Sequence, residues 1–296
     1  MLKLDFAFFS LGDKERKGLA GNRLVLERLT PLFFSPRIEK LLYLPYVDKK
    51  GCSLKLHLGR QNFKILSPLK KQETMTKAQD LIRSYGLNIL AADRRFKDDL
   101  LALSKHFMLT FGDNFIKALA LAMTERYLST KAVNRLVIVG RTDDFADLVE
   151  EFLKYNLPLS LQSLCPQEDE VMVYKFFYEK GYTLSASYIN PEGWQAGDLL
   201  LFFDCDPCSF KPALPGVYKL VYHNYSLNLQ PEWKEFMHKE GWDAQMHNMA
   251  PVLEACLLKE AGIREGESEN YNAGKLFTLL KALGDETDLW DMFLDR

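Results

Sequence analysis

The segment 140–145, GRTDDF, is the part of the sequence whose residue types are best suited to chemistry. It follows the apolar run 136–139, LVIV, which is typical of a strand buried on both faces of a sheet. A glycine at the end of such a strand lets the backbone turn tightly, and the N-terminus of a following helix stabilises an anion. Gly140, Arg141 and Thr142 are therefore candidates for holding the phosphates of a nucleotide cofactor.

The same segment also carries residues that oppose a phosphate. A dinucleotide-binding loop has three glycines, and Phe145 stands at or near the third, where its ring would crowd the helix against the strand. Asp143 and Asp144 lie where the anion would sit, and their carboxylates would repel it. The alternative interpretation is that both aspartates cap the helix and complement its dipole. The cofactor therefore stays open between NAD, NADP and none.

Cys205 and Cys208 form a C-x-x-C pair. Two thiolates at this spacing bind one metal ion or form a redox pair. A zinc site needs two further ligands, and Cys165 and His223 are the residues that the sequence offers. Because a free cysteine is also a common small core residue, the structural, metal-binding and redox interpretations all stay open.

Lys70 and His223 are the candidates for catalytic groups. Lys70 precedes a predicted helix, and its amine could orient a substrate or assist proton transfer; the alternative is a solvated charge beside Lys71. His223 follows a predicted strand, and its imidazole titrates near neutrality, as an acid–base group requires. The alternative for His223 is an inert, hydrogen-bonded side chain.

A parallel sheet would position most of these residues. Beyond residue 134, short apolar runs alternate with helical stretches, which predicts right-handed crossovers between parallel strands. Ligands in such sheets bind beyond the carboxyl ends of the strands. We therefore expect Arg141, Cys165, Asp204 and Tyr222 to gather at one edge, with Asp204 and Tyr222 as further cofactor-binding candidates. The predicted strands are 135–140, 157–164, 182–188, 198–203 and 217–222, and the predicted helices between them are 144–155 and 168–180.

The first third of the chain mixes short strands with helices and predicts a smaller α/β domain. Residues 54–58 and 64–69 indicate strands, residues 74–85 indicate a helix, and residues 113–129 form an amphipathic helix that leads into the second half. The expected fold class is therefore α/β. The expected domains are an N-terminal α/β domain of substrate type (1–110), a Rossmann-like domain with return helices (111–262), and a polar loop with a helical tail (263–296).

Three short motifs are spread along the chain: ILSPLK at 65–70, FGDN at 111–114 and MHNMAPVL at 246–253. In this order they resemble the shikimate-dehydrogenase-like group, which includes predicted amino-acid dehydrogenases and acyl-carrier-protein reductases. The resemblance implies a substrate domain, then a Rossmann domain, and last helices that fold back to the first domain. It also implies an NAD(P)-dependent oxidoreductase in which Lys70 is the catalytic lysine.

The chain departs from that group at the residues that carry its chemistry. The resemblance implies a catalytic aspartate two residues after Asn114, where this sequence has Ile116, and a substrate-binding glutamine that is absent between Met249 and Ala255. Together with the loop, these losses predict a Rossmann-like protein with an eroded dinucleotide and catalytic site. Such a protein would bind a small molecule or act as an interaction module. The alternative is a working NAD(P)-dependent oxidoreductase that acts on a small carboxylic or amino acid.

Composition narrows the expected partners and location. The chain has 296 residues, 47% of them hydrophobic, and a formal net charge of -2. We expect neither nucleic acid nor a membrane as a partner, because the net field is weak and no run reaches the roughly 18 apolar residues that span a bilayer. Five dispersed cysteines indicate a reducing compartment, so a cytoplasmic location is expected. Trp290 and Phe293 are expected to pack on the body of the protein or on a second subunit of a homo-oligomer.

Overall fold

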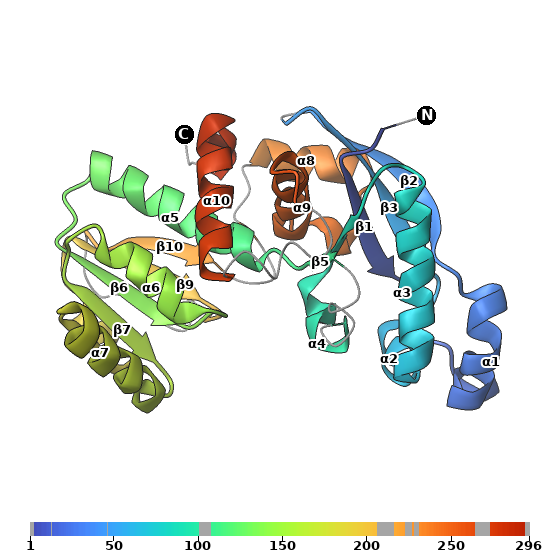
Figure 1. The fold of residues 1–296 in the computed structure, drawn as a ribbon, viewed down its shortest axis with the longest axis horizontal. Helices are drawn as coiled ribbons and strands as arrows, with labels where there is room; N and C mark the ends of the chain where they lie inside the picture. Colours follow the sequence, from blue (N-terminus) through green and yellow to red (C-terminus); the bar gives the residue numbers. More distant parts are fainter. Residues whose placement is uncertain are drawn as a thin grey trace. The chain divides into compact units, whose positions relative to one another are not determined.

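The computed structural model describes residues 3–12, 14–45, 47–100, 108–205, 216–222, 227, 231–263 and 273–293. The chain divides into two compact units, whose elements are labelled in Figure 1. Unit 1 comprises Met1–Gly112 and Glu235–Asn270, and unit 2 comprises Asp113–Lys234 and Tyr271–Arg296. Each unit is therefore assembled from two separate stretches of the sequence.

Unit 1 contains a five-stranded sheet in the order β2-β3-β1-β4-β5. All neighbouring pairs of these described strands are parallel except β2 and β3, which are antiparallel. β1 lies in the middle, and all six of its residues are buried, as expected for a strand covered on both faces. The strands are β1 (Phe6–Leu11), β2 (Arg37–Leu44), β3 (Lys49–Leu56), β4 (Ile89–Ala92) and β5 (Met108–Thr110).

The helix α9 (Ala250–Glu260) packs against β1, β4 and β5 of unit 1. Its residues 250–258, APVLEACLL, are all buried, which fits a helix that is apolar on almost every side. The other helices described in this unit are α1 (Arg23–Phe33), α2 (Arg60–Lys64), α3 (Pro68–Arg83), α4 (Lys97–Leu100) and α8 (Pro231–Lys239, which begins before the division), with 3-10 turns at Gly18–Gly21, Arg94–Phe96 and Ala244–Met246.

Unit 2 contains a fully parallel five-stranded sheet in the order β10-β9-β6-β7-β8. The first strand of the unit, β6, lies in the centre; the next two strands add on one side of it and the last two on the other, which is the doubly wound arrangement of Rossmann-like sheets. The strands are β6 (Arg135–Gly140), β7 (Leu159–Ser163), β8 (Leu184–Tyr188), β9 (Asp198–Phe203) and β10 (Tyr218–Tyr222). The helices are α5 (Asp113–Thr130), α6 (Phe145–Leu153), α7 (Pro166–Lys180) and α10 (Ala273–Glu286), with 3-10 turns at Pro191–Gly193 and Leu289–Phe293.

The helices of unit 2 pack in two groups: α5 contacts α6, α10 and β10, whereas α7 contacts β7 and β8. Residues 189–197, which connect β8 to β9, contain a 3-10 turn in place of a crossover helix. Trp194 in this connection is buried against Val137, Val139, Leu200 and Phe202. Its indole nitrogen donates to Gln162 Oε1 at 3.0 Å, so the bulky ring has its polar atom satisfied.

The tail packs on the body of unit 2. Trp290 is buried, and its ring lies 5.5 Å from that of Phe115 in α5, while the Phe293 ring lies 5.7 Å from the same ring. The structure thus shows the first of the two expected arrangements, in which these aromatic residues pack on the body of the protein. None of the helices among the described residues has the length and apolar character needed to cross a membrane.

The α/β class and the parallel sheet of the second half are confirmed, with β6 and β9 at the predicted bounds. The predicted strand at 64–69 is wrong. Those residues end α2 and begin α3, because Pro68 occupies the first turn of a helix, where its missing N–H is not needed. The division into units also differs from the expected domains, because α9 packs on the sheet of unit 1 and α10 packs on α5 of unit 2.

Candidate functional site

The carboxyl edge of the unit 2 sheet begins with Gly140 at the end of β6. Its φ is +88°, and a Cβ atom there would lie 1.9 Å from the carbonyl oxygen of Phe203. Gly140, Phe203 and Tyr222 are successive register partners across β6, β9 and β10, so the strand ends are level as the sequence predicted. The close approach of β6 and β9 therefore requires a glycine at this position whether or not a ligand is present.

Arg141 leaves this turn and pairs with the first turn of α7. Its guanidinium forms an ion pair with Glu168, and its Nε lies 3.3 Å from Oδ1 of Asp169. The Asp169 side chain is only 1% exposed, and its other oxygen accepts a hydrogen bond from Ser163 Oγ at 2.6 Å. A buried carboxylate needs a cation, and Arg141 supplies it. Arg141 is thus committed to an internal network.

Asp144 is committed in the same way. Its carboxylate lies 3.1 Å from Nζ of Lys117, a lysine of α5 whose side chain is 1% exposed. Asp144 has the left-handed backbone conformation, with φ 50° and ψ 42°, and its side chain makes no capping hydrogen bond to α6. The helix-capping interpretation is therefore wrong for the Asp144 side chain, because its carboxylate neutralises a buried ammonium instead.

Phe145 and Thr142 complete the turn. Phe145, whose ring was expected to crowd the loop, is 6% exposed. It is the first buried residue of α6, and Leu148 and Val149 are the next. Thr142 is half-buried. Asp143 and Asp204 both have partners of their own. Asp143, Asp144 and Asp204 thus place three carboxylates near the guanidinium of Arg141 in the described part of this edge.

Tyr222 is positioned by stacking rather than by the loop. Its ring lies 5.2 Å from that of Phe203 with 23° between the planes. Its hydroxyl is buried and has no hydrogen-bond partner in the described structure. Burial raises the pKa of this phenol well above its ordinary value. The residue lines a cavity of about 410 Å³ together with side chains of α5.

The cysteine candidates do not form a site within the described residues. Cys165 is exposed at the N-cap position of α7, and Cys205 is half-buried after β9 and has a contact of its own. Cys208 and His223 lie outside the described residues. No group of three His, Cys, Asp or Glu side chains that could hold a metal ion occurs in the part of the chain that is described.

Lys70 lies in the first turn of α3 in unit 1. Its Nζ is 2.7 Å from Oε2 of Glu73, and its side chain is 25% exposed. The neighbouring Lys71 lies over the ring of Phe63 at 5.4 Å. The structure therefore gives Lys70 a local ion pair of the kind that is common on helix surfaces.

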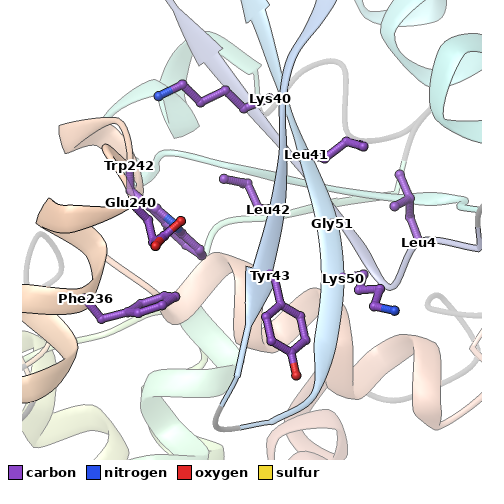
Figure 2. A pocket seen from close by; sticks show the side chains of 10 residues that line it. All are labelled: Leu4, Lys40, Leu41, Leu42, Tyr43, Lys50, Gly51, Phe236, Glu240 and Trp242. Atoms are coloured by element: carbon purple, nitrogen blue, oxygen red, sulfur yellow. The ribbon is translucent and has the colours of Figure 1, made fainter.

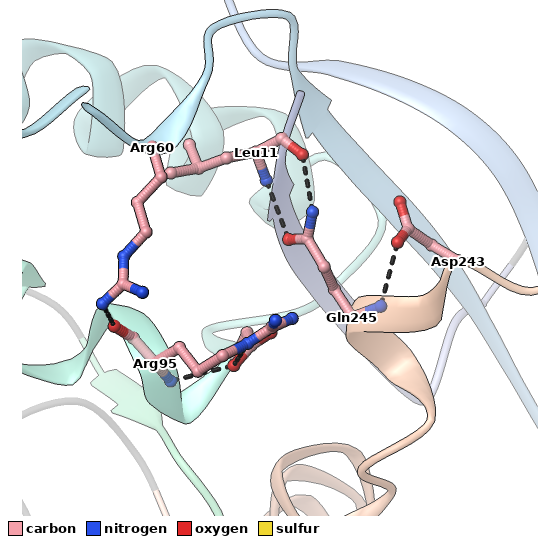
Figure 3. A network of polar contacts seen from close by, with 6 residues as sticks. Leu11, Arg60, Arg95, Asp243 and Gln245 are labelled. Carbon is pink, nitrogen blue, oxygen red and sulfur yellow. Dashed lines mark hydrogen bonds and ion pairs between the residues drawn. The ribbon is translucent and has the colours of Figure 1, made fainter. Parts of the chain in front are cut away.

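A polar network that sequence reasoning missed closes the carboxyl end of β1 (Figure 3). Gln245 accepts a hydrogen bond from the Leu11 N–H at 3.2 Å and donates one to the Leu11 carbonyl at 2.8 Å, as a neighbouring strand would. Asp243 accepts from the Gln245 backbone at 2.9 Å and pairs with Lys55. Gln245 stands four residues before the window in which a glutamine was sought and one residue before the motif at 246–253.

A second cavity, of about 430 Å³, lies in unit 1. Figure 2 shows Phe236, Glu240 and Trp242 facing the hairpin of β2 and β3 across it. Two of its polar groups have partners: Lys40 Nζ donates to the Gly241 carbonyl at 2.8 Å, and the Tyr43 hydroxyl donates to Asp48 at 2.9 Å.

No protein-family model matches this chain, and no curated protein matches its sequence. Solved structures with a similar arrangement include L-tryptophan dehydrogenase from Nostoc punctiforme, with a TM-score of 0.45 and 11% identity over 98% of this chain and 80% of that one. A chorismate mutase/shikimate 5-dehydrogenase fusion protein from Clostridium acetobutylicum has a TM-score of 0.35 and 11% identity over 96% and 98% of the two chains. Shikimate 5-dehydrogenase from Thermus thermophilus, in complex with NADP(H) and shikimate, has a TM-score of 0.29 and 11% identity over 95% and 99%.

Proposed function

We propose that this chain is a small-molecule-binding protein with a Rossmann-like unit whose phosphate loop is closed to dinucleotides. The observation that carries the proposal is the commitment of both loop charges. Arg141 forms an ion pair with the buried Asp169, and Asp144 forms one with the buried Lys117.

The energetics of the two ion pairs support this function. A diphosphate that recruited Arg141 would leave the carboxylate of Asp169 without its cation. Breaking a fully buried ion pair costs roughly 3–5 kcal/mol, and less where one partner is partly in water. Arg141 is 40% exposed, so the penalty is at the lower end of that range or below it, yet it still counts against binding. The diphosphate would also meet the carboxylates of Asp143 and Asp144, which repel it.

Titration with NAD, NADH, NADP and NADPH at millimolar concentration tests the proposal directly. A ligand at 100 times its dissociation constant adds about 2.7 kcal/mol to stability, which a thermal-shift measurement detects easily. We expect no saturable shift with any of the four dinucleotides. A saturable shift with one of them would overturn the proposal.

A second candidate function is an NAD(P)-dependent oxidoreductase acting on a small carboxylic or amino acid. It is favoured by the parallel strand order of unit 2 and by the positive φ of Gly140, which keeps the first position of a dinucleotide loop. In this function Lys70 would orient the substrate or assist proton transfer. Purified protein should then oxidise or reduce a nicotinamide cofactor with such a substrate. Replacing Lys70→Met should lower kcat without preventing dinucleotide binding.

A further inference from the structure

The cavity of unit 2 lies between α5 and β10, an outer strand of the parallel sheet. One wall is formed by Leu119 and Met123, one turn apart on α5, and the opposite wall by Leu220 and Tyr222 on β10. Its volume of about 410 Å³ is at the lower end of the range for small-molecule pockets. A ligand that filled it would therefore be compact and would have a largely apolar body.

Tyr222 is the group in this cavity that calls for a partner. Buried hydroxyl groups in folded proteins are almost always hydrogen-bonded, and an exception needs an explanation. The Tyr222 side chain is 3% exposed, and its hydroxyl neither donates nor accepts a hydrogen bond in the described structure. Burial raises the pKa of the phenol, so the hydroxyl keeps its proton and is available as a donor. An acceptor atom on a ligand would satisfy it.

The charged residues of the same cavity are all cations. Arg126, Lys131 and Lys219 line it, and no acidic residue is among its described lining. Arg126 pairs with Asp291 at 2.5 Å, whereas Lys131 and Lys219 have no ion pair with the described residues. Two available ammonium groups beside an apolar wall favour a ligand that carries negative charge at one end.

We propose that this cavity binds a small organic acid with an apolar body, whose carboxylate is attracted by Lys131 and Lys219 and which accepts a hydrogen bond from Tyr222. The inference rests on the proposed small-molecule function and names the ligand class and the place. It makes no use of the loop at Gly140, so the dinucleotide titration and the experiment below succeed or fail separately.

The test uses three acids as probes: 4-phenylbutyrate, indole-3-propionate and hexanoate, each titrated into the whole protein and followed by ligand-observed NMR. We expect at least one acid to bind saturably and its uncharged primary amide to bind much more weakly. Replacing Lys219→Gln should weaken binding several-fold, whereas the exposed Lys175→Gln on α7 should leave it unchanged. Binding of none of the three acids, or equal binding of acid and amide, would overturn the proposal.

The Tyr222→Phe variant separates a binding role from a packing role. Removing a hydroxyl that has no partner in the free protein should leave its melting temperature unchanged or higher. The same change should weaken binding of the acid roughly three- to tenfold, the effect of one hydrogen bond. Tyr43→Phe, in the cavity of unit 1, is the matched control and should not change the affinity. An unchanged affinity in Tyr222→Phe would remove this residue from the site and contradict the proposal.

Discussion

The two units close the carboxyl edges of their sheets by different means. In unit 1 the contacts to the end of β1 are hydrogen bonds: Gln245 pairs with the backbone of Leu11, and Glu15 accepts from the N–H groups of Gln61 and Asn62 at the start of α2. The ion pair between Lys55 and Asp243 in this network does not touch Leu11. In unit 2 the closure is made by ion pairs, with Arg141 and Asp144 each serving a buried charge of opposite sign. Removing one hydrogen bond costs little stability, whereas removing one partner of a buried ion pair leaves an uncompensated buried charge and costs more.

The two cavities are similar in volume but differ in the charge and hydrogen bonding of the residues that line them. Their volumes are about 430 Å³ in unit 1 and about 410 Å³ in unit 2. In unit 1, Lys40 and Tyr43 have partners within the chain, and Glu240 balances part of the positive charge. In unit 2, Tyr222 has no partner in the described structure and the charged lining is positive. The buried hydroxyl of Tyr222, which has no partner in the described structure, marks the cavity of unit 2 as the binding site, and the volume does not.

The largest expected loss of stability is for a glycine of unit 2, and a glycine of unit 1 serves as its comparison. Gly140→Ala should destabilise the protein by about 4 kcal/mol or more, because the added Cβ would lie 1.9 Å from a backbone oxygen of Phe203. Gly86, in unit 1, has a similar φ of +79° but nothing within 4 Å of an added Cβ. Gly86→Ala should cost only about 1 kcal/mol of backbone strain. Urea unfolding measures both, and equal losses would show that the strand contact is not the constraint at Gly140.

The next effect tests the ion-pair closure of unit 2. Asp144→Asn keeps a residue that tolerates the left-handed conformation, yet it leaves the buried ammonium of Lys117 without a counter-charge. Because the Asp144 side chain is 45% exposed, we expect a loss at the lower end of the range for buried pairs, about 3 kcal/mol in the free energy of unfolding. Adding Lys117→Met to this variant should recover most of the loss, because the stranded charge is then gone. A single variant as stable as the wild type would contradict the role given to this pair.

At the carboxyl edge of the unit 2 sheet, the sequence predicted the strands better than the side-chain contacts. The strands β6 and β9 were placed correctly because each is a short apolar run, of the length typical of a buried strand, next to a glycine. The pairing of Lys117 with Asp144 was missed, since it joins residues that meet only through the packing of α5. A signal existed: Lys117 is the one charged residue in the apolar stretch 115–123 of that helix, FIKALALAM. A lone lysine in such a stretch needs a buried partner.

Other features of the site depend on tertiary structure alone. No pattern in the sequence shows that the Tyr222 hydroxyl lacks a partner, because that depends on every side chain packed around it. Arg141 was correctly placed after β6, but its direction toward Asp169 follows from where α7 begins. The role of a charged residue in a loop is therefore decided by its neighbours in space, which the loop sequence does not specify.

A smaller effect tests the hydrogen-bonded closure of unit 1. Gln245→Ala removes two hydrogen bonds to Leu11, each contributing about 0.5–1.5 kcal/mol. We expect a loss of about 2 kcal/mol, smaller than that of Asp144→Asn, because the groups left without a partner at Leu11 are uncharged. Chemical denaturation of the two variants side by side measures the difference. A larger loss for Gln245→Ala would reverse the contrast between the two kinds of closure.

The smallest effect concerns how the buried phenol of Tyr222 makes the stability of the protein depend on pH. Burial raises the pKa of Tyr222 well above 10, so above that pH the unfolded phenol loses a proton that the folded one keeps. The unfolded state then binds fewer protons, and stability falls as pH rises by about 1.4 kcal/mol per pH unit for this group. Tyr222→Phe should lack that part of the slope between about pH 10 and 11, while Tyr174→Phe, on an exposed face of α7, should keep the wild-type slope. Because the Tyr222 effect comes from burial of the phenol, identical slopes in all three proteins would mean that water already reaches its hydroxyl.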